Sequence, residues 1–240
     1  MKTAVILAAG MGYRIKNLFD IPKGFIEINN ISLIERSISI LKEFGIKNIL
    51  IGTGYKSNLY ENMQDGKHIF CIKNKFYYKS GSFYTLYNLR NVIKENFLLL
   101  ESDLIYEKAV IKSLINSTEN NVLIASNLSG SNDEVYIKVD NNKYLKKISK
   151  NKNKIIKTFG EFVGISKISY DSFISICNWT KKNVDKVIDL HYEDIFSINS
   201  SNIKFKVKKL ENLIWSEIDT EEHYKNVIDN IYPNIIKNEK

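Results

Sequence analysis

The chain has 240 residues, of which 44% are hydrophobic and 26% are charged. These values are typical of a globular protein, so they exclude a wholly disordered chain, and the simplest prediction is a single domain over residues 1–240. A net charge of +8 leaves open a nucleic acid, an anionic membrane surface or a small polyanionic substrate as the partner. The two cysteines have neither a disulfide pattern nor metal-ligand spacing.

The first predicted element is a buried strand over residues 4–7, which runs directly into a glycine-containing turn. Gly10 and Gly12 lack a Cβ atom, so the backbone there can approach a ligand closely and offer successive N–H groups to an anion. Arg14 and Lys23 add positive charge. An ordinary tight turn with two solvated basic residues is the alternative, because neither a dinucleotide fingerprint nor a P-loop is completed.

The strand at residues 4–7 is too short for the core of a signal peptide or for a membrane span. We therefore expect a cytoplasmic protein without a membrane partner. The lysines are spread over the chain, and a tract such as residues 143–157 is typical of a solvated surface. This dispersal argues against a nucleic-acid partner and favours small-molecule substrates, while a homodimer is left open.

Strand and helix patterns then alternate along the chain. Strands are predicted over residues 24–28, 46–54, 68–72, 96–103, 122–126, 159–166 and 203–207, and helices over residues 31–44, 57–63, 108–114 and 170–180, from residue 191 and from about residue 220. Residues 133–140 and 144–148 read as a β-hairpin that interrupts this alternation. The order predicts an α/β protein, with a Rossmann-like three-layer α/β/α fold, a mixed, mostly parallel central sheet and an inserted β-hairpin.

The most aromatic segment, residues 75–87, leads into a predicted helix with Ser80 or Ser82 as its N-cap. Core packing is the ordinary interpretation of Phe83, Tyr84 and Tyr87. Further along, Asp103 follows a buried strand directly, at the sheet edge where ligands of parallel sheets gather. Asp219 precedes the last predicted helix, and a helix cap is the ordinary interpretation of an Asp at that position.

The segment Leu7-Ala8-Ala9-Gly10-Met11-Gly12-Tyr13-Arg14, with Pro22-Lys23, resembles the signature of the sugar-nucleotidyltransferase-like superfamily of NTP transferases. The interval between Arg14 and Pro22 is about one residue shorter than usual for that family. The resemblance implies that the loop from Leu7 to Gly12 wraps a nucleoside triphosphate, which Arg14 and Lys23 neutralise. It also implies that Ser80, Gly81, Ser82 and Ser102 approach the nucleotide, and that Asp103 and Asp219 bind Mg²⁺.

A second set of segments is similar to 2-aminoethylphosphonate cytidylyltransferases: residues 101–106, 133–136, 149–151, 160–164 and 217–219. Residues 81–87 also resemble phosphocholine cytidylyltransferases. Glu134 and Glu161 favour an acceptor with a primary ammonium, whereas Tyr84, Tyr87 and Trp215 keep a quaternary ammonium open. Tyr136 is placed with this acceptor group, and Lys150 is expected to hold the acceptor's phosphonate or phosphate.

The resulting hypothesis is a CTP-dependent cytidylyltransferase that uses Mg²⁺ and transfers CMP to 2-aminoethylphosphonate. Phosphocholine, phosphoethanolamine and phosphoglutamine are alternative acceptors. A protein that binds a nucleotide or a nucleic acid without turnover is the alternative from a different functional class.

Overall fold

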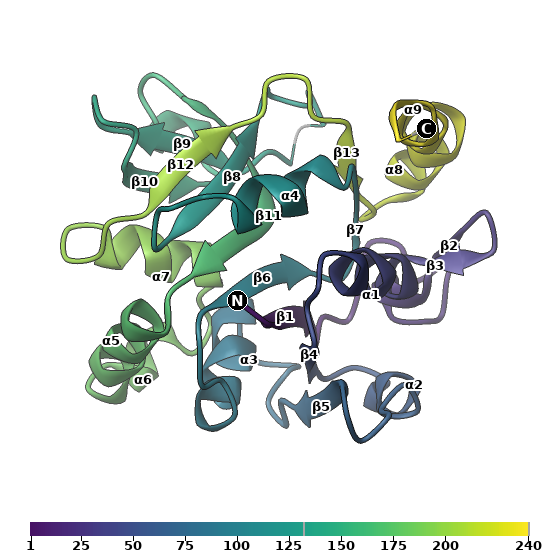
Figure 1. Cartoon of the computed structure of the whole chain (residues 1–240), viewed down its shortest axis with the longest axis horizontal. Helices are drawn as coiled ribbons and strands as arrows, with labels where there is room; N and C mark the ends of the chain where they lie inside the picture. Colours follow the sequence, from purple (N-terminus) through teal and green to yellow (C-terminus); the bar gives the residue numbers. More distant parts are fainter. Residues whose placement is uncertain (132, 240) are drawn as a thin grey trace.

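The computed structural model describes residues 1–131 and 133–239, and Figure 1 shows its arrangement. Thirteen strands lie within these residues: β1 (Thr3–Ala8), β2 (Glu27–Ile28), β3 (Ile31–Ser32), β4 (Asn48–Thr53), β5 (Ile69–Lys73), β6 (Phe97–Glu101), β7 (Leu104–Tyr106), β8 (Val122–Ser126), β9 (Tyr136–Val139), β10 (Leu145–Ser149), β11 (Gly160–Ile168), β12 (Lys206–Lys209) and β13 (Trp215–Glu217). In the described part of the chain, nine of them form one sheet, with the order β10-β9-β11-β6-β1-β4-β5 and with β8 between β11 and β12.

The direction of these strands makes the sheet mixed and mostly parallel. β4 and β6 pair with β1 in parallel, β5 pairs with β4 in parallel, and β12 pairs with β8 in parallel. β11 runs antiparallel to its neighbours β6, β8 and β9. Only β11 and β10 among the described strands of this sheet therefore oppose the direction of β1, as predicted.

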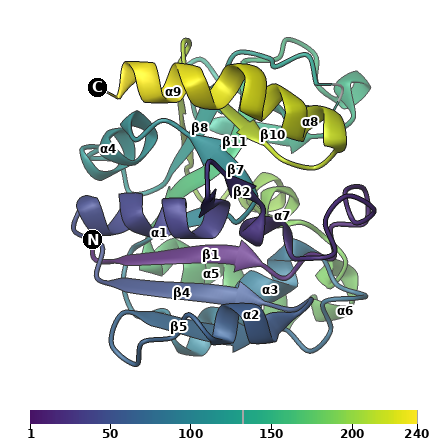
Figure 2. The same ribbon diagram turned by 90° about the vertical axis from the view of Figure 1, so that its right-hand side faces the viewer.

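Helices cover both faces of the sheet. Within the described residues they are α1 (Leu33–Glu43), α2 (Ser57–Glu61), α3 (Ser82–Asn88), α4 (Ala109–Ile115), α5 (Tyr170–Lys181), α6 (Val184–Val187), α7 (Tyr192–Asn199), α8 (Glu221–Asn226) and α9 (Tyr232–Asn238), with short 3₁₀ segments at Lys23–Phe25, Leu89–Asn91 and Lys152–Lys154 and a π-helical segment at Val227–Ile231. In Figure 2, α1 lies on the near side of β1 and β4, and α3 and α5 lie behind them.

The side chains of β1 explain why helices are needed on both sides. Val5 and Leu7 belong to a core cluster with residues of α3, α5 and α7. Ala4, Ile6 and Ala8 belong to a second cluster with residues of α1, α2 and α4. Because successive side chains of a strand point to opposite faces, an unbroken apolar strand requires apolar cover on both. The predicted three-layer α/β/α architecture is thus confirmed.

The predicted hairpin is also confirmed, since β9 and β10 pair antiparallel. It is joined to the main sheet by β11, whose first residues pair with β9 and whose last residues pair with β6. A register shift in β11 lies between Phe162 and Ser166, where Gly164 has a φ of +79°. Glycine suits this position because L-residues rarely adopt that conformation.

Two predicted strands are displaced. The strand expected over residues 24–28 begins as a 3₁₀ turn at Lys23–Phe25, and only Glu27–Ile28 pairs, with β3. The late strand expected over residues 203–207 is β12, at Lys206–Lys209, and it begins later than predicted. Among the described residues, no helix is long and apolar enough to cross a membrane.

Candidate active site

The main cavity, of about 280 Å³, lies at the carboxyl end of β1. Residues expected to contact the nucleotide line it: Leu7, Ala8, Ala9, Gly10, Ser80, Gly81, Ser82 and Ser102. Met11 and Gly12 are not among its lining residues. Gly12 has a φ of +60°, and a Cβ atom there would lie 3.1 Å from the Cγ atom of Lys23, so its role is to let the loop turn beside that lysine.

Lys23 joins the two predicted metal ligands. It begins the 3₁₀ turn after the loop, and its ammonium group forms ion pairs with both Asp103 and Asp219. Both carboxylates are buried, with exposed fractions of 8% and 5%. Although burial alone would lower it, the charges of Asp103 and Asp219 raise the pKa of Lys23. Lys23 therefore carries its charge at neutral pH.

Asp103 and Asp219 meet because β7 and β13 pair antiparallel next to them. Leu104 lies opposite Glu217, and the Ile218 amide donates a hydrogen bond of 3.0 Å to the Asp103 carbonyl. Asp219 is not the N-cap of α8, the helix expected from about residue 220. That role belongs to Thr220, whose hydroxyl accepts a hydrogen bond from the His223 amide at 3.2 Å. The alternative in which Asp219 only caps a helix is therefore wrong.

Arg14 extends the cluster of charges toward the inserted hairpin. Its guanidinium group contacts Asp219 and Asp133, and Asp133 also accepts a hydrogen bond of 3.1 Å from Lys150. Although burial opposes it, Lys23 and Arg14 lower the pKa of Asp219. The three basic residues predicted to act in the reaction, Arg14, Lys23 and Lys150, are thus brought together at one cavity.

The beginning of α3 differs from the prediction, because neither Ser80 nor Ser82 is its N-cap. The N-cap is Gly81, which packs so closely on the chain before α7 that a Cβ atom would lie 2.0 Å from the Leu190 carbonyl oxygen. Ser82 instead accepts a hydrogen bond from the Tyr192 amide and is hydrogen-bonded to His191, each at 3.2 Å. The part of the cavity lined by Gly81 and Ser82 is therefore fixed to the beginning of α7.

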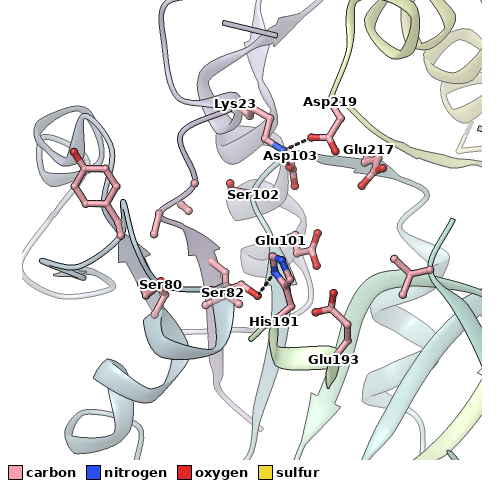
Figure 3. A pocket seen from close by; sticks show the side chains of 18 of the residues that line it. Lys23, Ser80, Ser82, Glu101, Ser102, Asp103, His191, Glu193, Glu217 and Asp219 are labelled. Carbon is pink, nitrogen blue, oxygen red and sulfur yellow. Dashed lines mark hydrogen bonds and ion pairs between the residues drawn. The ribbon is translucent and has the colours of Figure 1, made fainter. Parts of the chain in front are cut away.

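Several acidic residues of the cavity were not assigned from the sequence. Figure 3 shows Lys23, Asp103 and Asp219 together on one side of the pocket, with Glu101, His191 and Glu193 on the other. Burial and the charges of Asp219 and Asp103 raise the pKa of Glu217 to about 8. A signal was present in the chain: Glu101 with Asp103, and Glu217 with Asp219, each repeat a Glu-x-Asp spacing at the end of a strand.

A small side recess adjoins the main cavity. Glu101, Val135, Glu193 and Glu217 line both, and the recess has room for about 20 Å³. We call it the acidic recess because its ionisable lining residues are all carboxylic acids: Glu101, Asp133, Glu161, Glu193 and Glu217, with Trp215 beside them. Glu161 and Trp215, both expected at the acceptor, therefore lie here and not in the main cavity.

The other residues expected at the acceptor lie outside the lining of both spaces. Tyr87 is buried in the core cluster with α5 and α7, and Tyr84 packs against that cluster. Glu134 is buried and accepts hydrogen bonds from the Gly130 amide at 3.1 Å and from the Tyr136 hydroxyl at 3.0 Å. Core packing accounts for Tyr84 and Tyr87. A buried hydrogen-bond network accounts for Glu134 and Tyr136.

The donor set fits a hard divalent cation. Asp133, Glu217 and Asp219 each offer a carboxylate oxygen, and these oxygens lie within 4.8 Å of one another. Asp103 shares the ammonium group of Lys23 with Asp219. Mg²⁺ prefers carboxylate, water and phosphate oxygens, which this site and a bound triphosphate can supply. Asp219 belongs to both carboxylate groups and is thus at the centre of the predicted metal site.

Comparison with known proteins finds sequences similar to this chain. The MobA-like NTP transferase domain matches residues 4–156. The choline-phosphate cytidylyltransferase of Streptococcus pneumoniae is 28% identical over 116 residues, 48% of this chain and 51% of that protein, so the alignment spans about half of that relative. The CTP:phosphoglutamine cytidylyltransferase of Campylobacter jejuni is 25% identical over 239 residues, 90% of this chain and 92% of that protein.

Solved structures give the same fold. The inositol-1-phosphate CTP transferase of Thermotoga maritima superposes with a TM-score of 0.83 at 19% identity, covering 99% of this chain and 96% of its own. The CTP:phosphocholine cytidylyltransferase of Streptococcus pneumoniae has a TM-score of 0.78 at 22% identity, covering 95% of this chain and 99% of its own. The resemblance to NTP transferases that the sequence indicated is confirmed.

Proposed function

Since this chain belongs to the MobA-like NTP transferase family, we propose that it is a cytidylyltransferase that transfers CMP from CTP to a small phosphonate or phosphate acceptor. 2-Aminoethylphosphonate is the acceptor we place first. The observation that carries the proposal is the cluster in which Lys23 and Arg14 contact Asp103 and Asp219 at the end of β1. It combines the cations that a triphosphate needs with the carboxylates that its metal needs.

The proposed reaction is a displacement at phosphorus. A phosphonate or phosphate oxygen of the acceptor attacks the α-phosphorus of CTP, and a new oxygen–phosphorus bond forms. The bond between the α-phosphorus and the bridging oxygen to the β-phosphorus breaks, and pyrophosphate leaves with that electron pair. No protein nucleophile is required, so the enzyme's contribution is alignment and neutralisation of charge.

The basic residues have separate roles in the proposed reaction. Lys23 and Arg14 balance the negative charge that moves onto the leaving pyrophosphate, and the backbone of the glycine loop holds its oxygens. Mg²⁺, when bound by Asp103 and Asp219, supplies further neutralisation of the triphosphate. Lys150 orients the acceptor's phosphonate for attack. These cations also form ion pairs with Asp103, Asp219 and Asp133, which hold them at the cavity.

Two features support cytidine and a zwitterionic acceptor. The relatives that match this chain include enzymes named for CTP and for phosphocholine or phosphoglutamine. The carboxyl groups next to the cavity suit an acceptor that carries a cation as well as a phosphorus group. Phosphocholine, phosphoethanolamine and phosphoglutamine share that combination and are the alternative acceptors.

A pyrophosphate-release screen tests the proposal. CTP, UTP, ATP and GTP are each combined with 2-aminoethylphosphonate, phosphocholine, phosphoethanolamine, phosphoglutamine and inositol 1-phosphate, with Mg²⁺. We expect release with CTP and an amine-bearing acceptor, its loss on addition of EDTA and its recovery with excess Mg²⁺. Preference for UTP would refute the cytidine assignment, and no release from any pair would refute the transfer itself.

A further inference from the structure

Glu193 lines the acidic recess and has no role in the reaction described above. Its side chain is buried, with an exposed fraction of 8%, and it lines both the main cavity and the recess. Its Oε2 atom has no hydrogen-bond partner within the described residues. A buried carboxylate oxygen without a donor is costly, because burial removes the water that would otherwise bind it. Because Glu193 lines the recess, a donor on a ligand bound there would satisfy this oxygen.

Three other carboxyl groups of the recess have hydrogen-bond or ion-pair partners. Glu101 accepts a hydrogen bond of 2.6 Å from the Tyr192 hydroxyl, and Glu161 accepts one of 2.6 Å from the Ser129 amide. Asp133 is paired with Arg14 and Lys150. These contacts hold Glu101, Glu161 and Asp133 around the recess, whereas the buried Oε2 atom of Glu193 has no partner among the described residues.

The charge of the recess also differs from that of the main cavity. Arg14, Lys23 and Lys150 are among the lining residues of the main cavity, whereas no lysine or arginine lines the recess in the part of the chain that is described. A cation placed there meets carboxyl groups without competing with a basic side chain of the lining. The chemistry of the recess therefore selects a cationic group.

A second metal ion explains Glu193 less well. The carboxylates whose oxygens converge closely enough to share an ion are Asp133, Glu217 and Asp219. Neither Glu193 nor Glu101 belongs to that group of described residues. An ammonium group needs hydrogen-bond acceptors spread around three N–H bonds, not a convergent shell of oxygens at one point.

The volume limits which cation fits. A space of about 20 Å³ holds about one water-sized group. A primary ammonium has that size and has three donors for the carboxyl groups. A trimethylammonium group is several times larger, donates no N–H hydrogen bond and is best held by ring faces, of which the described lining of the recess contains that of Trp215.

We propose that the acidic recess binds the primary ammonium group of the acceptor, and that the Glu193 carboxylate is its specificity-determining partner. This inference rests on the proposed CMP transfer. It restricts the acceptor to a primary amine linked by a short chain to a phosphonate or phosphate, whose phosphorus group stays beside Lys150 while the amine enters the recess. Phosphocholine and a neutral acceptor then become poor substrates.

The first test needs only the wild-type protein. With CTP and Mg²⁺, kcat/KM is measured by pyrophosphate release for 2-aminoethylphosphonate and for propylphosphonate, in which a methyl group replaces the ammonium. Phosphoethanolamine and phosphocholine form a second pair. We expect the primary amine of each pair to be favoured by about 100-fold, the size of a lost charge-assisted contact. Equal values within the first pair, or a preference for phosphocholine, would overturn the inference.

The second test uses Glu193→Gln, with Glu27→Gln as the control, because Glu27 is exposed on β2. For Glu193→Gln we expect KM for 2-aminoethylphosphonate to rise by about 10- to 100-fold, with an unchanged KM for CTP and an unchanged Mg²⁺ requirement. Glu193→Asp should recover part of the loss. CTP binding by calorimetry verifies that the variants fold.

The outcomes separate the inference from the proposed function. If no acceptor yields pyrophosphate from CTP, the transfer reaction is wrong. If transfer occurs but Glu193→Gln shifts only the Mg²⁺ requirement, the recess is a metal site and the ammonium assignment is wrong. Unchanged acceptor KM in a folded Glu193→Gln variant would also refute the assignment while leaving the transfer intact.

Discussion

At the end of the main cavity that contains Lys23, the basic and acidic side chains form ion pairs. In the acidic recess, by contrast, a buried carboxyl oxygen has no partner among the described residues. Lys23 contacts Asp103 and Asp219, but Glu193 has a buried oxygen without a donor among the described residues. At the paired end, the phosphate oxygens of a proposed substrate would contact the basic side chains, and its metal ion would contact the carboxylates. An unpaired carboxyl oxygen gains a contact from a hydrogen-bond donor, and the contact is strongest when the donor is a cation. The proposed function assigns the two ends to different parts of the substrates, and this difference in charge pairing is its physical basis.

The largest expected effect comes from breaking the paired end. Asp103→Asn keeps the shape of the side chain and removes its charge, so the site loses a partner of Lys23 and, in the proposed reaction, a metal ligand. We expect kcat to fall by about two to three orders of magnitude, the usual cost of losing one preorganised electrostatic contact. Steady-state pyrophosphate release measures the change.

Asp171→Asn is the matched control, because Asp171 is exposed on the first turn of α5. It should leave kcat unchanged. A folded Asp103→Asn protein with the wild-type rate would remove Asp103 from the proposed chemistry and would leave Asp219, Asp133 and Glu217 as the metal ligands to test.

A smaller effect is expected where the two ends are joined. In Gly81→Ala the added Cβ atom would lie 2.0 Å from the Leu190 carbonyl oxygen, so the contact between α3 and the chain before α7 must open. We expect the free energy of unfolding to fall by about 1–3 kcal/mol. Urea denaturation measures it.

Gly10→Ala is the contrasting variant, because no atom lies within 4 Å of a Cβ placed there. Its stability should equal that of the wild type, while KM for CTP should rise, since the added methyl group occupies the surface that the triphosphate approaches. Equal stability of Gly81→Ala and Gly10→Ala would contradict the described contact between Gly81 and Leu190.

The smallest effect concerns a carboxylate that is fully satisfied, in contrast to Glu193. The side chain of Asp65 accepts hydrogen bonds from the amides of Lys67, His68 and Ile69. Hydrogen bonds from the backbone, that of His68 first, lower the pKa of Asp65. A lowered pKa means that the carboxylate stabilises the fold above its unfolded pKa of about 3.9 and loses that contribution as the pH falls through the folded value.

We therefore expect the Tm of Asp65→Asn to lie slightly below that of the wild type at pH 7. The difference should shrink when thermal denaturation is repeated near pH 2 to 3. A difference that grows on acidification would show that the amides do not bind the ionised form of Asp65.

The sequence was a good guide to the paired end of the cavity. The apolar run of β1 is buried on both faces, so its pattern is strong, and the glycine loop with Arg14 and Lys23 follows it directly. Asp103 could be placed at the sheet edge because it follows β6. That Asp219 meets it depends on the pairing of β13 with β7, which no local pattern reports.

The acidic recess was harder to predict for the same reason. Glu193 reads locally as a residue in the first turn of α7, and it reaches the cavity only because α7 begins against Gly81. Tyr84 and Tyr87 were misplaced for the opposite reason. Their aromatic segment lies near a predicted binding loop, which suggested that they line the substrate pocket. The helical spacing of α3 instead turns them toward the core.

The most direct test of the account follows the α-phosphorus of CTP. The protein is incubated with α-labelled CTP, Mg²⁺ and 2-aminoethylphosphonate, and the products are separated by chromatography. We predict that the label appears in an adduct of CMP with the phosphonate, in amounts equal to the pyrophosphate released, and that Asp103→Asn forms almost none. Label that remains in CTP, or that appears only as free CMP, would contradict the proposed transfer.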